Sequence, residues 1–210
     1  MNRENLASRI LTLISGGLGI IAGLCFLVSG LQVILQAGIT VDEVVSACGS
    51  LAFGVAFFIG GTVLLFSFFK KKYTLFPYIL PIIVLAGEAI IWLIHFILLN
   101  VAGADGLGSA RNTLIFLFVF GFAGIFFLVF SLLQKESKLK TVLLLIGIAI
   151  SFAALLRGFP YYFGADGAGE FFSAQVFIGL FVAELLTMVV RKREEKPREI
   201  PAESETKEEK

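Results

Sequence analysis

The sequence predicts an all-α integral membrane protein in which six transmembrane helices form three helical hairpins. Three observations lead to this fold class. Hydrophobic residues make up 58% of the 210 residues and charged residues only 16%, which is far from the balance of a soluble domain. Six apolar runs come close to or exceed the roughly 20 residues that cross about 30 Å of hydrocarbon. Basic residues gather in every second connection between these runs.

The six predicted spans use nearly all of residues 1–190, which we treat as one membrane domain. In lipid, backbone N–H and C=O groups must be paired within their own segment, so apolar runs of this length are helices rather than strands. They leave no room for a soluble catalytic domain. The predicted spans are residues 10–36, 45–69, 74–100, 112–133, 141–162 and 171–190.

The distribution of basic residues predicts how the spans are oriented. Fifteen of the 17 Lys and Arg residues precede the first span, separate the second from the third or the fourth from the fifth, or follow the sixth; Arg111 and Arg157 are the exceptions. Short cytoplasmic connections attract Lys and Arg. We therefore expect a multi-pass protein of the cell membrane with both termini in the cytoplasm and three turns facing out.

The three outward turns share an acidic residue at similar spacing. Asp42, Asp105 and Asp166 lie 63 and 61 positions apart, and the last two stand in Gly-Ala-Asp-Gly sequences. Glycine allows positive φ and an Asp side chain hydrogen-bonds its own downstream backbone, so these sequences are typical of tight turns. This weak internal repeat predicts three hairpins and explains the Asp residues without a metal ion.

Small residues predict close packing of the first span against the second. The first span carries glycines at intervals of four and seven residues, and the second span carries stripes of Ser, Ala and Gly. Helices associate in lipid largely through close packing, which small residues permit. A seam between two copies of the chain is the alternative. The expected packing residues are Gly16, Gly19, Gly23, Gly30, Gly54 and Gly60.

The third span carries a proline and a face with ionisable residues, whereas the fourth span is rich in phenylalanine. Pro81 removes a backbone hydrogen bond near the start of the third span and is expected to bend it. Further along, Glu88, Trp92 and His95 follow at offsets of four and three, which places them on one helix face. The phenylalanines of the fourth span spread around the helix, which favours lipid contact and packing over a ligand cage.

The last two spans end in helix-breaking or charged sequence. Gly158 and Pro160 are expected to bend or stop the fifth span just after Arg157. The sixth span contains Glu184 about two turns before a basic cluster. Residues 191–210 are rich in Lys and Glu with almost no apolar residues, so we expect a disordered cytoplasmic tail whose basic start lies on anionic headgroups.

Charged side chains within the spans point to a functional site, because each costs roughly 2.5–3.5 kcal/mol on insertion scales. We predict a substrate-binding or proton-coupling site formed by Glu88, Trp92, His95 and Arg157, open toward the outer face. Histidine titrates near neutral pH, so His95 would exchange protons with Glu88. Arg157 would hold an anionic group or neutralise Glu88. The alternative is a structural ion pair that locks the third helix to the fifth.

Glu184 is a secondary candidate for the functional site. The alternatives are that it lies at the cytoplasmic membrane interface or pairs with a lysine of a connecting loop.

Several function classes lack their sequence motifs: there is no phosphate-binding Gly-Lys-Ser/Thr loop, a single histidine excludes HExxH, and no Gly-x-Ser-x-Gly sequence occurs. Cys25 and Cys48 fit neither a redox pair nor a metal site. We therefore predict no catalytic residues, no enzymatic activity, no metal and no cofactor.

Repeated hairpins are common in transporters. The sequence therefore favours small-solute or proton-coupled transport, or a subunit of a transport system. The alternative is a non-transport membrane protein that acts in assembly, sensing or stress response. The expected partners are the lipid bilayer and a small-molecule substrate or a partner membrane subunit, and nothing in the sequence favours nucleic acid.

Overall fold

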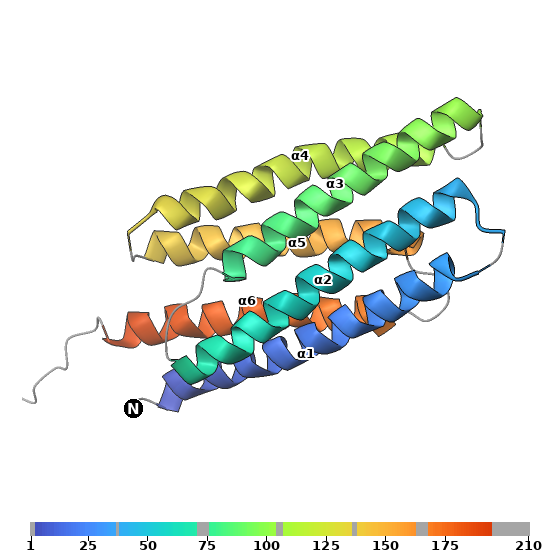
Figure 1. The fold of residues 1–210 in the computed structure, drawn as a ribbon. Helices are drawn as coiled ribbons and strands as arrows, with labels where there is room; N and C mark the ends of the chain where they lie inside the picture. The colour runs from blue at the N-terminus through green and yellow to red at the C-terminus, as the bar shows by residue number, and fades with distance from the viewer. Residues whose placement is uncertain are drawn as a thin grey trace, which may run out of the picture.

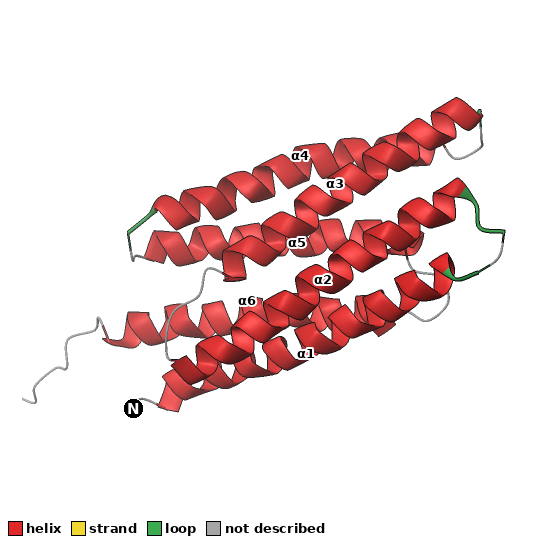
Figure 2. Ribbon diagram, in the orientation of Figure 1, coloured by secondary structure: helices red, strands yellow, loops and turns green. Residues whose placement is uncertain are grey.

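The computed structural model of the chain describes residues 3–36, 38–70, 76–103, 107–135, 138–162 and 168–194. These residues form α-helices and no strand (Figure 2). Each of the six helices is long and apolar enough to cross a membrane, which confirms the prediction of an all-helical chain with six membrane-length helices. The helices are α1 (Arg3–Ile34), α2 (Val41–Lys70), α3 (Phe76–Ala102), α4 (Leu107–Leu133), α5 (Lys138–Tyr162) and α6 (Ala168–Glu194).

Most helix ends lie beyond the predicted spans, except that α1 ends at Ile34 and α3 begins at Phe76. α1 begins seven residues before the predicted start at residue 10, and α6 continues to Glu194, because apolar composition marks the hydrocarbon crossing and not the end of backbone hydrogen bonding. Of the two expectations at Gly158 and Pro160, a bend or a stop, the stop is excluded, since α5 continues to Tyr162, where the predicted span also ends. A proline in the last turn removes only one backbone donor, so the helix persists.

Some predictions fall on parts of the chain that the structure does not describe. The turns at Asp105 and Asp166 and the tail after Glu194 lie outside the described residues. The described connections show two glycines with positive φ, Gly38 at 79° and Gly103 at 62°. Gly103 directly follows α3, where a left-handed residue is a common way to end a helix.

The six helices alternate in direction and fall into two groups of three. The starts of α1, α3 and α5 lie at the same end of the bundle as the ends of α2, α4 and α6 (Figure 1). In one group, α1 packs against α2 and α6; in the other, α3, α4 and α5 contact one another. Contacts of α2 with α3, of α5 with α6 and of α2 with α5 join the two groups.

Within the first group, α1 and α2 approach so closely that side chains would not fit at several glycines. A Cβ atom on Gly23 would lie 2.6 Å from the backbone nitrogen of Phe58, and one on Gly61 would lie 2.5 Å from the carbonyl oxygen of Gly16. Gly61 is absent from the predicted seam, where Gly60 was expected instead. The backbones are therefore in direct contact along this interface, as small residues permit in lipid.

The start of α2 is closed by a capping box. The backbone N–H of Glu43 donates to the Thr40 hydroxyl at 3.3 Å, and the backbone N–H of Thr40 donates to a Glu43 carboxylate oxygen at 2.7 Å. This reciprocal pair satisfies two backbone donors that a helix start leaves open. Glu43 therefore has a structural role at the bundle end opposite the start of α1.

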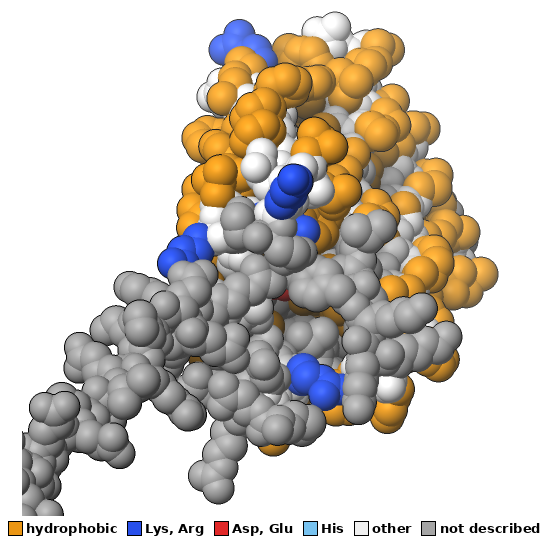
Figure 3. Space-filling model, turned by 90° about the vertical axis from the view of Figure 1, so that its left-hand side faces the viewer, with side chains coloured by type: hydrophobic (Ala, Val, Ile, Leu, Met, Phe, Trp, Pro, Cys, Tyr) orange, Lys and Arg blue, Asp and Glu red, His pale blue; other side chains and the backbone are white. Residues whose placement is uncertain are grey.

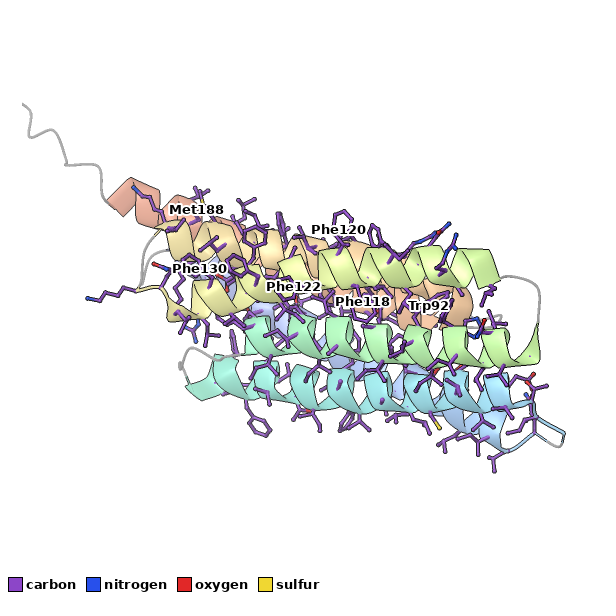
Figure 4. All side chains as sticks on the ribbon, turned by 90° about the horizontal axis from the view of Figure 1, so that it is seen from above. Trp92, Phe118, Phe120, Phe122, Phe130 and Met188 are labelled. Carbon is purple, nitrogen blue, oxygen red and sulfur yellow. The ribbon has the colours of Figure 1, made fainter. Side chains whose placement is uncertain are left out.

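The outer surface is apolar along the sides and carries basic residues at one end. Figure 3 looks onto the end where α1 begins, with Lys and Arg side chains among the helix ends and hydrophobic side chains on the flanks. Soluble proteins rarely expose such large apolar areas. The phenylalanines labelled on α4 in Figure 4 are among the outward side chains, between 41% and 76% exposed: Phe118, Phe120, Phe122 and Phe130.

Candidate functional site

Glu88 on α3 is enclosed by the bundle. Its side chain is 0% exposed, and among the described residues neither carboxylate oxygen has a hydrogen-bond partner. Leu85, one turn earlier, contacts α4 at Gly124, and Ile91, one turn later, contacts α2 at Gly49. Residues three apart are rotated by about 60° on a helix, so Glu88 points between α4 and α2. This is the direction of α5, which also contacts α3.

The depth of Glu88 follows from the contacts of Gly124. A Cβ atom on Gly124 would lie 2.9 Å from Leu85 and 3.0 Å from Ile150, so the Leu85 and Ile150 side chains approach within about 6 Å. Because α3 and α5 run in the same direction, Ser151 lies at a depth similar to that of Glu88. Ser151 is 0% exposed and its hydroxyl donates to the Gly147 carbonyl oxygen at 2.8 Å. The Ser151 hydroxyl therefore does not donate a hydrogen bond to Glu88.

Trp92 and His95 continue the face of Glu88 toward the C-terminal end of α3. Trp92 is 6% exposed and His95 is 3% exposed. Their rings meet edge to face, with centroids 5.5 Å apart and planes at 84°. Figure 4 labels Trp92 in the later half of α3. Three of the four predicted site residues therefore share one buried helix face.

Arg157 lies apart from this buried group. Its side chain is exposed, and its position on α5 is rotated by about 120° from Ser151, outside the buried face of that helix. Arg157 follows Ser151 by six residues, so it lies about 9 Å farther along α5 toward the far end of the bundle. Since the Glu88 oxygens have no hydrogen-bond partner in the described part of the chain, no such bond joins them to Arg157 in this conformation.

The helices around Glu88 supply no charge at its depth. Residues 44–69 of α2, 112–133 of α4 and 141–156 of α5 contain no Asp, Glu, Lys or Arg. An isolated ionised carboxylate in a low-dielectric interior has a far higher free energy than its neutral acid. Glu88 is therefore stable either as the neutral, protonated acid or as a carboxylate that binds a cation or a hydrogen-bond donor. The described residues of the surrounding helices provide neither a cation nor a hydrogen bond to it.

Glu184 belongs to a different polar cluster, where α6 packs against the start of α1. It is 9% exposed and follows Ala183, whose carbonyl oxygen accepts a 3.0 Å hydrogen bond from the Ser8 hydroxyl. The Ser8 and Thr187 hydroxyls also lie 3.1 Å apart. Glu184 thus lies near the bundle end where α1 begins, whereas Glu88 lies at the middle of α3.

Other kinds of site find little support in the described residues. No group of three or more His, Cys, Asp or Glu side chains there is placed to hold a metal ion. Cys25 is half-buried and Cys48 is exposed, and both are free thiols. Comparison of the chain with protein-family models, with curated proteins and with solved structures gives no match.

Proposed function

We propose that this chain is a multi-pass membrane protein that transports a small solute coupled to protons, with Glu88 as the proton-carrying group. The observation that supports this function is the Glu88 carboxyl group, which is 0% exposed and has no hydrogen-bond partner among the described residues. Ionisable groups within a bilayer are costly and typically belong to proton relays or substrate pathways. Six membrane-length apolar helices are compatible with a multi-pass protein.

The orientation belongs to the same proposal. The helix ends near Arg9, Lys138 and Lys140 form the basic end of the bundle, and basic connections favour the cytoplasmic side. Both termini then face the cytoplasm in the cell membrane. Trp92 and His95 then lie on the outer side of Glu88, within about two helical turns of it along the same face of α3.

Movement between the two three-helix groups would give solute access to Glu88. Glu88 on α3 faces the region where α2 of one group meets α3 and α5 of the other. Many transporters alternate access by rocking one bundle against another around a fixed site. Direct backbone contact between α1 and α2 at Gly16 and Gly61 keeps the first group together as one unit.

A non-transport role in membrane assembly, sensing or stress response is the second candidate. The exposed Arg157 and the exposed aromatic face of α4 favour it, because aromatic side chains are enriched where proteins meet partners. In that role a partner membrane subunit covers α4, and Glu88 contributes only to the packing of the bundle. Transport assays separate the two functions.

Proton flux in liposomes tests the proposed function. We expect that the full chain, reconstituted with a trapped pH-sensitive dye, produces a change of internal pH when a transported solute is added outside. The solutes to compare are amines, carboxylic acids and uncharged sugars, with protein-free liposomes as the control. Accumulation of a solute without any proton movement, or no protein-dependent flux with any of the three classes, would contradict coupled transport.

A further inference from the structure

We propose that Glu88, Trp92 and Phe53 bind a monovalent organic ammonium ion, so that the solute at this site is a small amine with an apolar body. This inference rests on the proposed function and names the substrate class of the same site. It is carried by three features: a carboxyl group with no hydrogen-bond partner among the described residues, the absence of other charges at its depth, and two aromatic residues, one a turn along α3 and one packed against Gly87.

The charge of the ligand follows from the charges around the carboxyl group. An ionised Glu88 supplies one negative charge, and the facing ranges of α2, α4 and α5 supply none. His95 is the other titratable side chain on this face of α3, and Arg157 on α5 is exposed and farther out. A ligand with a single positive charge therefore restores neutrality, whereas an anion or a divalent ion does not.

The ligands available around Glu88 favour an organic cation over a divalent metal ion. Hard divalent ions take six to eight oxygen ligands, and among the described residues no cluster of His, Cys, Asp or Glu is placed to hold a metal. The Ser151 hydroxyl at this depth donates to its own helix. An ammonium ion needs fewer fixed oxygens, because a carboxylate and aromatic faces together satisfy it.

Aromatic residues lie one turn after Glu88 on α3 and, from α2, against the preceding residue Gly87. Trp92 lies four residues after Glu88, and side chains at this spacing are neighbours on a helix surface, about 5–6 Å apart at their Cβ atoms. The Phe53 ring of α2 lies against Gly87, where a Cβ atom would be 3.1 Å from the ring. A cation held by Glu88 is therefore within reach of the indole face, the strongest cation–π partner among side chains.

Access to the site requires the structure to open, because Glu88, Trp92 and Phe53 are all buried. Phe53 belongs to the group of α1, α2 and α6, whereas Glu88 and Trp92 belong to the group of α3, α4 and α5. Separation of α2 from α3 withdraws the Phe53 ring from Gly87, the residue that precedes Glu88. The movement invoked for transport thus also opens the ammonium site.

The single tryptophan of the chain makes the site directly observable. Trp92 is the only tryptophan, so the intrinsic tryptophan fluorescence of the purified full chain reports on this face of α3. The probes are benzyltrimethylammonium and its uncharged carbon analogue neopentylbenzene, titrated into the protein in lipid nanodiscs. The variants are Glu88→Gln and Phe53→Leu, with Glu43→Gln as the matched control, because Glu43 caps α2 away from the site and Gln also serves in a capping box.

We expect a saturable fluorescence change with benzyltrimethylammonium in the wild type and in Glu43→Gln. We expect at least tenfold weaker binding in Glu88→Gln and weaker binding in Phe53→Leu. A flat titration in the wild type, equal affinity in Glu88→Gln, or equal binding of neopentylbenzene to the wild type would overturn the proposal. The wild-type comparison of the two probes is decisive even if a variant does not fold.

The outcome for the ammonium site can be told apart from the outcome for transport. Proton flux that is evoked by a carboxylic acid or a sugar, together with a flat ammonium titration, overturns the ammonium site and leaves coupled transport standing. Saturable ammonium binding that depends on Glu88, without proton flux for any of the three solute classes, supports the ammonium site and overturns coupled transport.

Discussion

Substitution of Glu88 by glutamine is expected to reduce solute-evoked proton movement to the level of protein-free liposomes. Glutamine has nearly the same shape as glutamate but cannot bind and release a proton near neutral pH. No charged side chain lies at this depth on α2, α4 or α5 to take its place. The measurement is the rate of internal pH change in liposomes that contain equal amounts of wild-type or variant protein.

The same variant is expected to remain folded, which separates a functional role from a structural one. The Glu88 oxygens have no hydrogen-bond partner among the described residues, so the substitution breaks no ion pair or hydrogen bond, and the free energy of unfolding should change by no more than about 1 kcal/mol. Glu43→Gln is the control in the same assay. Coupled flux that is unchanged in Glu88→Gln, or a variant that is strongly destabilised, would contradict a proton-carrying role.

Gly61→Val is expected to have the largest effect on stability. A Cβ atom at this position would lie 2.5 Å from the Gly16 carbonyl oxygen and 2.6 Å from the Ile20 backbone nitrogen. Backbone atoms cannot rotate away as a flexible side chain can, so α1 and α2 must separate. Overpacking typically costs about 1–3 kcal/mol, and we expect this variant at or above the upper end. The measurement is the unfolding midpoint in detergent, followed by circular dichroism.

Gly17→Ala is the matched control for this interface. Gly17 lies on α1, next in the chain to the Gly16 that Gly61 contacts, but nothing lies within 4 Å of the position its Cβ atom would take. Alanine is favoured over glycine within a helix by roughly 0.5–1 kcal/mol, so this variant should be neutral or slightly more stable. If Gly61→Val and Gly17→Ala unfold at the same midpoint, the close backbone contact between α1 and α2 is not what stabilises the first helix group.

The sequence was sufficient to predict the six long helices but not their ends. Runs of apolar residues reveal the lipid crossings, because only paired backbone and apolar side chains are stable there. Helices continue beyond the hydrocarbon wherever the backbone remains paired, as α1 does back to Arg3. The capping box at Thr40 and Glu43 was visible in the sequence as Thr-x-x-Glu, and it explains why α2 begins at Val41 rather than at residue 45.

The sequence was sufficient to place site residues that lie on one helix, but not those whose direction depends on how two helices pack together. Glu88, Trp92 and His95 share a face because of their spacing along α3, which any straight helix preserves. The direction of Arg157 depends on which face of α5 packs inward, and that is decided by contacts such as Gly124 with Ile150. Gly61 was missed for the same reason, since the choice between neighbouring glycines depends on how α2 is rotated toward α1.

Reaction of Glu88 with a hydrophobic carbodiimide is the most direct measurement of whether this carboxyl group exchanges with the outside of the bundle. The reagent partitions into lipid and adds to neutral carboxylic acids, so it can reach a 0% exposed group only if the helices open. We expect peptide mass spectrometry of the treated full chain to find the adduct on Glu88, and benzyltrimethylammonium to slow its formation. Complete absence of the adduct from Glu88 in folded, lipid-embedded protein would contradict a proton- and cation-exchanging site.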